Sequence, residues 1–181
     1  MFETYPMDYL RQNFEELLSY WHDLPKNEFG IPRRSDFRAM HLPHLVPHMF
    51  VLERLSRYEG LMRMSGSEME AQTDQHTTSK ILLKDFPRDE WEQYAEFSEV
   101  VLTQPCGGRM ARTVSYRGNR VMDSLTMCLP FSDDEGVSKF QIGLFGSVTN
   151  HNIQSPGEQV TQMKTLALAI SYFDIGFGCP D

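Results

Sequence analysis

Residues 109–148 read RMARTVSYRGNRVMDSLTMCLPFSDDEGVSKFQIGLFGSV, and they carry the clearest indication of fold class in the chain. Apolar and polar residues alternate along this segment, which is typical of strands with one buried face. Two groups of turn-forming residues, GN at 118–119 and DDEG at 133–136, divide it into three runs. We therefore predict three long antiparallel strands that follow one another in a meander.

Two further strands and a helical region precede this meander. The segments HMFVLERLS (48–56) and GLMRMSGS (60–67) are apolar runs of strand length, and RYEG between them favours a hairpin. The following residues, 67–86, indicate short helices and loops, and Pro87 then begins a longer helix. The inner stripe of that helix is predicted to be Trp91, Tyr94, Ala95, Ser98, Val101 and Leu102.

The first segment of the chain has the spacing of an amphipathic helix. From Asp8 to Trp21 the apolar residues recur every three or four positions. They are Leu10, Phe14, Leu17, Leu18 and Trp21. Pro25, Gly30 and Pro32 then end the helix, so residues up to 44 form an irregular connector.

The order of these elements predicts an α+β domain on one five-stranded antiparallel sheet. Short helices lie between the second and third strands, and the amphipathic helix lies outside the sheet. We divide the chain into an N-terminal helix with its proline-containing connector (1–44), a core (45–150) and a C-terminal tail (151–181). In the tail, PGEQVTQMK (156–164) is compatible with a helix, and the alternation over residues 166–172 favours a strand or an extended segment.

Composition excludes several classes of function. The formal net charge of −8 repels phosphate backbones, so we expect no nucleic acid partner. No apolar run approaches the length of a membrane span and no secretory signal begins the chain, so we expect a cytoplasmic protein without a membrane partner. Cys106, Cys128 and Cys179 are odd in number and far apart, which argues against a disulfide framework and a thiolate zinc site.

Several short motifs occur along the chain in a set order. They are Trp21 at the end of the first helix, IPRRSDF (31–37), LPHLVPHMFVLE (42–53), RMSG (63–66), LPF (129–131) and YFDIGFGCP (172–180). In this order, over roughly residues 15–178, the sequence resembles PAS_5, a bacterial family of small PAS-like proteins. After RMSG this family usually has a glycine-bearing turn around a TG pair, whereas DQHTTSK (74–80) contains no glycine.

The resemblance implies a PAS-like sensor or signalling module whose sheet and intervening helices can enclose a small ligand. We expect it to bind a small molecule, a signalling protein or both, and to act in trans. A pocket combines apolar walls with a few placed polar groups. The ligand-binding candidates are Arg63, Met64, Trp91, Tyr94, Arg112, Met127 and Phe145. The alternative for each of them is a place in an ordinary hydrophobic core.

PAS-like domains commonly pair through a helix outside the sheet, so the resemblance also implies a homodimer. The dimer interface candidates are Leu10, Phe14, Leu18 and Trp21 of the first helix, unless they pack on their own sheet. Two alternatives to the sensor stay open: an interaction adaptor without a ligand, and an enzyme of the isomerase or dehydratase type. The enzyme needs an acid-base group, for which Asp123 is best placed. No catalytic motif occurs, and we expect no enzyme.

Histidines and arginines in the connector raise a second question. His41, His44 and His48 lie within eight residues, but Pro43 makes the helix that would bring two of them onto one metal doubtful. His76 could bind haem by analogy with some PAS domains, yet its neighbours are polar. We therefore expect neither a metal nor a haem cofactor. The arginines of RRSDF (33–37) could hold an anion or fix the connector, and we favour the second role.

Overall fold

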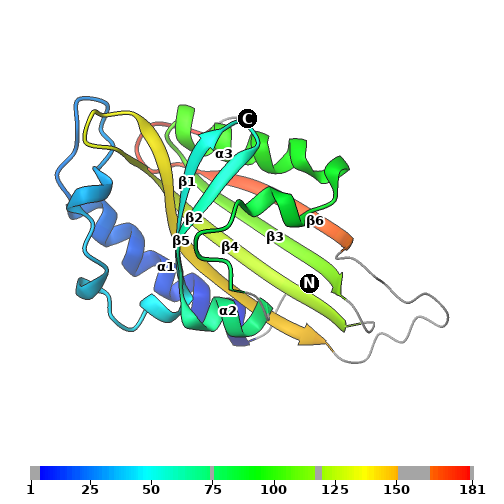
Figure 1. Cartoon of the computed structure of the whole chain (residues 1–181). Coiled ribbons are helices and arrows are strands. Elements are labelled where there is room, and N and C mark those ends of the chain that lie inside the picture. Colours follow the sequence, from blue (N-terminus) through cyan, green and yellow to red (C-terminus); the bar gives the residue numbers. More distant parts are fainter. Residues whose placement is uncertain (1–4, 74–75, 117–119, 151–163, 180–181) are drawn as a thin grey trace.

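A single antiparallel sheet organises residues 5–73, 76–116, 120–150 and 164–179, which are the residues described by the structure, a computed structural model. Its strands follow the order β2-β1-β5-β4-β3-β6 (Figure 1). They are β1 (Met49–Ser56), β2 (Glu59–Ser65), β3 (Gly107–Tyr116), β4 (Arg120–Ser132), β5 (Ser138–Asn150) and β6 (Lys164–Phe173). The predicted α+β class, with two strands, a helical crossing and three strands, is confirmed.

The sheet has six strands in this part of the chain, one more than the five we predicted. β6 pairs antiparallel with β3 and so covers an edge that a five-strand order leaves open. This strand is the one that the alternation over residues 166–172 favoured. A helix at 156–164 falls almost entirely outside the described residues, except for Lys164, which begins β6.

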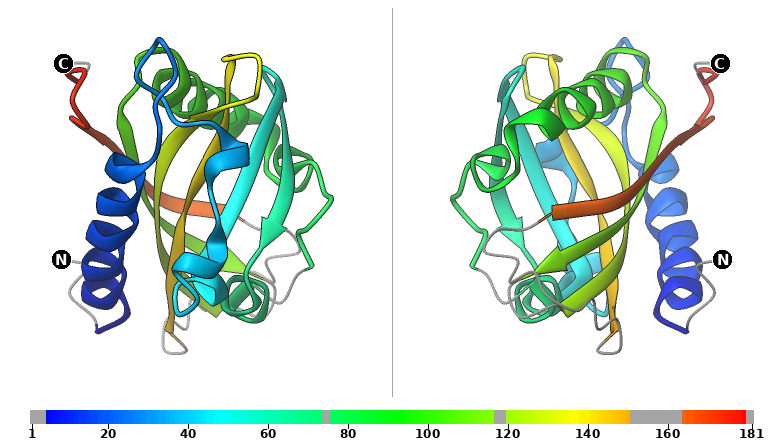
Figure 2. Two further views of the ribbon diagram at one scale, coloured as in Figure 1. Left: turned by 90° about the vertical axis from the view of Figure 1, so that its left-hand side faces the viewer. Right: turned by 90° about the vertical axis from the view of Figure 1, so that its right-hand side faces the viewer.

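Helices cover both faces of the sheet (Figure 2). The long helix α1 (Tyr5–Asp23) lies on one face, called the α1 face below. On the other side, called the α3 face, lie α2 (Ser67–Thr73) and α3 (Trp91–Thr103). Two separate hydrophobic clusters result, one on each face. Among the described residues, no helix is both long and apolar enough to cross a membrane.

The apolar stripe of α1 packs on the sheet of its own chain. Leu10, Phe14 and Trp21 are at most 2% exposed, and the Trp21 Nε1 group donates a hydrogen bond to the Pro130 carbonyl at 2.9 Å. Leu18 is half-buried against the same cluster. The proposal that these four side chains form a dimer seam is therefore wrong, because the sheet already occupies the stripe. Amphipathic spacing shows that a helix has a buried face but not what covers it.

The connector after α1 is fixed to both the helix and the sheet. His41 shares a hydrogen bond with the Tyr20 hydroxyl at 3.0 Å, and His44 bonds the Glu16 carboxylate at 2.8 Å. The two histidines thus bind different partners on α1. No three His, Cys, Asp or Glu side chains of the described residues gather into a metal-binding group.

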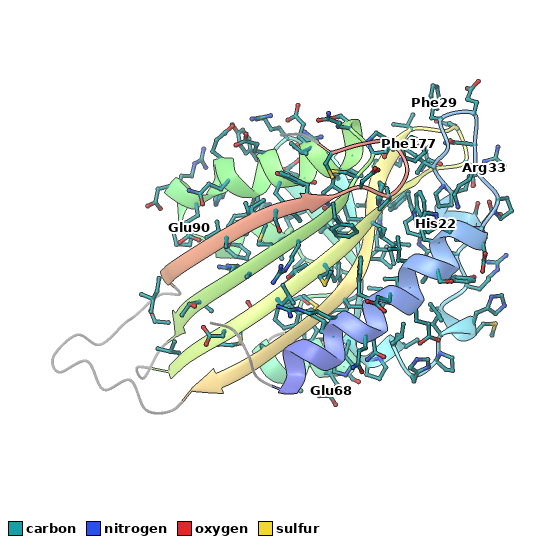
Figure 3. All side chains as sticks on the ribbon, turned by 180° about the vertical axis from the view of Figure 1, so that it is seen from behind. His22, Phe29, Arg33, Glu68, Glu90 and Phe177 are labelled. Atoms are coloured by element: carbon teal, nitrogen blue, oxygen red, sulfur yellow. The ribbon has the colours of Figure 1, made fainter. Side chains whose placement is uncertain are left out.

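The RRSDF segment lies at the end of β4. The backbone N–H of Ser132 donates to the Pro32 carbonyl at 3.0 Å, and the Ser35 hydroxyl donates to Asp134. These contacts attach the connector to the end of β4 through Pro32 and Ser35, and the role predicted for the two arginines stays a prediction. Arg33 lies at the opposite end of the strands from Glu90, which neighbours the start of β6 (Figure 3).

Candidate functional site

The α3 face encloses a cavity of about 160 Å³ between the sheet and the segments that cross it. Its floor is formed by side chains of β1 to β5, and its roof by α2, α3 and residues 77–86. The apolar lining is Phe50, Leu52, Met62, Met69, Leu82, Leu83, Phe86, Ala95, Phe97, Met110, Met122 and Phe145. Methionine and phenylalanine dominate this wall, and methionine adapts to irregular ligand shapes.

Strand alternation selects which residues face the cavity. On β4 every second residue lines it, from Met122 through Ser124 and Thr126 to Cys128. Leu125 and Leu129, at odd-numbered positions of the same strand, belong to the cluster on the α1 face. The same period of two therefore supplies the cavity floor on one face and the core under α1 on the other.

Three of the seven ligand-binding candidates lie together in the cavity wall. Tyr94 comes from α3, Arg112 from β3 and Phe145 from β5. Tyr94 and Phe145 are both 8% exposed, and the side chain of Arg112 is 12% exposed. The sequence thus identified one contributor from the roof and two from the floor.

Arg63 and Met64 lie outside the cavity because β2 contains a bulge. Val51 pairs with Met64 whereas Leu52 pairs with Met62, so Arg63 is the extra residue. Met64 then shares the α1 face with Val51, whereas Met62 lines the cavity. Arg63 itself donates a hydrogen bond from Nε to Glu53 at 2.6 Å, and its side chain is 53% exposed.

Met127 and Trp91 are also displaced from the predicted site. Met127 is five positions from Met122, and residues an odd number apart on a strand face opposite sides. It packs against the cluster on the α1 face. Trp91 packs at the rim of the α3-face cluster, where its Nε1 donates to the Phe86 carbonyl at 3.1 Å, and it does not line the cavity.

Arg112 is the charged group held deepest in the wall. Its guanidinium lies 4.6 Å from the ring centre of Phe86 and 5.1 Å from that of Tyr94, within the range of cation–π attraction. Nη2 donates to Thr165 Oγ1 of β6 at 3.0 Å and lies 3.8 Å from the Glu90 carboxylate. Arg112 therefore connects the cavity wall with the sixth strand.

Gln141 is a buried amide in the cavity floor that sequence reasoning missed. It is 3% exposed, accepts a hydrogen bond from Ser98 at 3.2 Å, and donates to the Cys128 sulfur at 3.8 Å. A polar residue at an inward position of a strand is the signal that could have identified it. Gln141 is thus one of the few polar groups in the cavity wall, and its amide can both donate and accept hydrogen bonds.

The buried thiols near this site are poor nucleophiles. Burial, and secondarily the neighbouring Cys179, raises the pKa of Cys106 to about 11. Burial is also the main cause that raises the pKa of Cys128 far above its ordinary value. Only the thiolate is a good nucleophile, so both groups stay protonated and unreactive near neutral pH.

The enzyme alternative loses its acid-base group in the structure. Asp123 lies between Met122 and Ser124, which both line the cavity, and so it faces the opposite side of β4. There its carboxylate accepts a hydrogen bond from Thr113 Oγ1 at 2.6 Å. A role for Asp123 inside the cavity is therefore wrong. The haem candidate His76 is also outside the cavity wall, exposed and bonded to Glu70 at 3.0 Å.

A tight turn at residues 77–80 closes the cavity beside the edge strand β2. The N–H of Lys80 bonds the Thr77 carbonyl at 3.0 Å, and Ser79 has a φ of +68°, which together describe a type II turn. Glycine is the usual residue at this position, because its backbone enters the left-handed region without strain. Ser79 therefore occupies a position of the turn where glycine is the usual residue.

The turn is attached to β2 by backbone hydrogen bonds. Met62 N–H donates to the Lys80 carbonyl at 3.0 Å, and Ser79 N–H donates to the Met62 carbonyl at 2.7 Å. Thr77 and Lys80 line the cavity from this turn. Neither was predicted, since nothing in the local sequence shows that the polar loop folds back onto the strand.

Comparison with known proteins agrees with this architecture. No curated protein and no solved structure matched the chain. A family described as PAS domain, PAS_5, matches residues 11–146, which run from α1 into β5 and include β1 to β4 in full. The match covers well over half of the sequence, and the chain belongs to the PAS_5 family of PAS domains.

Proposed function

We propose that this PAS domain is a sensor that binds a small, mostly apolar molecule in the cavity of the α3 face. The observation that carries the proposal is a cavity walled by apolar side chains from both the sheet and its roof, with Arg112, Gln141 and Thr77 as placed polar groups. Binding pockets usually have this combination of apolar walls and few polar groups.

The cavity volume limits the size of the ligand. An apolar cavity of about 150 Å³ accepts a molecule such as benzene in another protein. The volume of about 160 Å³ therefore suits one aromatic ring, or an aliphatic chain of similar size, with a short substituent. Larger cofactors such as haem need more room than these walls leave, unless the roof moves.

Signalling in this proposal requires that the ligand favours one conformation over another. Arg112 contacts the cavity and also Thr165 of β6, so a ligand that touches its guanidinium also acts on the attachment of β6. The output then passes in trans to a signalling protein or to a second copy of the chain. Either partner would bind a surface other than the buried stripe of α1.

Thermal unfolding with small aromatic and aliphatic probes tests the proposal. Probes such as indole, toluene and hexanol should raise the melting temperature of the wild type, because a ligand that binds only the folded state stabilises it. Ala95→Leu adds bulk inside the cavity and should abolish this shift. The same substitution at Ala39, half-buried on the α1 face, is the matched control and should retain it. No shift with any probe would leave an interaction adaptor without a ligand as the remaining function.

A further inference from the structure

The charged residues that line the cavity are all cationic. Among the described residues, the lining contains Arg54, Arg57, Lys80 and Arg112 but no aspartate or glutamate. Such an imbalance beside an apolar cavity is unusual for a site that only accommodates neutral hydrocarbon, because like charges repel each other. The question is which of these cations already has a partner.

Carboxylates of α3 neutralise the two arginines next to the β1–β2 turn. Arg54 Nη2 lies 3.2 Å from Glu99, and Arg57 bonds both Glu99 and Glu92. These two carboxylates lie behind the cavity wall, on the helix that forms its roof. The two arginines and two glutamates therefore balance and leave no net charge for a ligand.

Lys80 has no such counterpart. Arg112 lies near Glu90, as described above, but no carboxylate of the described residues comes within ion-pair distance of the Lys80 ammonium. Lys80 lies at the exposed rim of the cavity, where its long side chain can reach an entering molecule. The cavity thus has an excess of one positive charge at its rim.

Thr77 provides a second group in the same turn. Its hydroxyl is buried and has no hydrogen-bond partner within the described part of the chain, and the residue is 8% exposed. Leaving a buried hydroxyl unpaired is unfavourable, so a ligand oxygen that bonds it would be stabilised there. The backbones of Thr77 and Lys80 are joined by the turn hydrogen bond, so both side chains start from one turn that is bonded to β2, and both line the cavity.

We infer that the ligand is a small monocarboxylate, whose apolar body fills the cavity and whose carboxylate binds the Thr77 hydroxyl and the Lys80 ammonium. The inference rests on the proposed ligand-binding function and adds the chemical class of the ligand. A carboxylate carries one negative charge and can therefore serve as the ion-pair partner that the Lys80 ammonium does not have within the described residues. Its oxygens accept hydrogen bonds from both Thr77 and Lys80. A phosphate dianion would bring a second charge for which the site has no unpaired cation.

Two pairs of nearly isosteric probes test the inference at low salt: phenylacetate with phenylacetamide, and hexanoate with hexanamide. Titration calorimetry on the wild type should show each carboxylate binding about tenfold more tightly than its amide, as charge-assisted hydrogen bonds predict. Lys80→Gln and Thr77→Val should each reduce this preference several-fold, while the amide affinities stay within about twofold. Lys84→Gln, an exposed lysine outside the cavity lining, is the control and should retain the full preference.

The possible outcomes separate this inference from the function on which it rests. If the amides bind as tightly as the carboxylates, the inference that the ligand is a monocarboxylate is overturned, while the proposal of a ligand-binding cavity is still supported. A preference that survives in both Lys80→Gln and Thr77→Val would overturn the assignment of the two residues. Absence of binding by all four probes would count against the inference and the ligand-binding function together.

Discussion

Replacement of Ser79 by glycine should stabilise the protein, because this serine holds a backbone conformation that glycine adopts freely. Its φ of +68° lies in the left-handed region, where a residue with a Cβ atom loses about 1–2 kcal/mol. Glycine loses about 0.5–1 kcal/mol more conformational entropy on folding than other residues. The difference predicts that Ser79→Gly raises the free energy of unfolding by about 0.5–1 kcal/mol.

Gly136 offers the opposite experiment in the turn between β4 and β5. Its φ is +88°, and the closest atom to an added Cβ would be Asn27 Nδ2 at 3.9 Å, so alanine fits without a clash. Gly136→Ala should therefore lower the free energy of unfolding by about 1 kcal/mol through the backbone alone. Ser79→Ala keeps the Cβ atom and should leave the stability within about 0.5 kcal/mol of the wild type.

Urea unfolding followed by tryptophan fluorescence measures all three variants. The midpoint should rise for Ser79→Gly and fall for Gly136→Ala, with the slope m unchanged, because the surface exposed on unfolding stays the same. If Ser79→Gly were no more stable than Ser79→Ala, the turn would not be strained at this residue. The reasoning from the left-handed backbone of Ser79 would then be refuted.

Three further predictions concern α1, the sheet faces and the C-terminal loop. Trp21→Phe leaves the buried carbonyl of Pro130 without its donor and should cost about 1–3 kcal/mol in urea unfolding, and an unchanged stability would contradict the packing of α1. Met127→Ala should destabilise the protein but leave the affinity for the best probe unchanged, whereas Phe145→Ala should weaken that affinity. An equal loss of affinity in both variants would contradict the placement of Met127 on the α1 face. Three backbone N–H groups that follow Asp174 hold its pKa below the ordinary value, so its carboxylate stabilises the fold above about pH 4 and loses this effect as the pH falls through the lowered pKa. The difference in melting temperature between wild type and Asp174→Asn should therefore shrink as the pH falls from about 5 to about 3, the range in which a carboxyl group titrates. A difference that stays constant over this range would argue against the bonds between Asp174 and the three N–H groups.

Alternation of residue types predicted the sheet well. A strand with one face on a core and the other elsewhere needs different residue types at alternate positions, and this pattern is visible in the sequence. It identified the meander and the first hairpin, it favoured a strand or an extended segment where β6 lies, and it placed Arg112 and Phe145 on the correct face. The error at Met127 came from neglecting that rule, since Met122 and Met127 cannot share a wall. That part of the site was predictable.

Other features leave no local trace in a single sequence. The bulge at Arg63 inverts the side of Met64, and neither residue type requires a bulge. The burial of the α1 stripe against its own sheet, and the return of the turn at 77–80 to β2, are contacts between segments far apart along the chain. Hydrophobic periodicity shows that a face is covered, but the covering element is decided by tertiary packing.

The turn at 77–80 has a second consequence, for the solubility of the protein. β2 is an edge strand, and exposed edge strands can pair with strands of other molecules and start aggregation. The bonds between this turn and Met62, together with the bridge between Leu61 and Ile81, occupy part of that edge. A molecule that enters the cavity by displacing the turn must therefore uncover an edge of the sheet, so easier ligand entry and a greater tendency to aggregate come from the same set of hydrogen bonds.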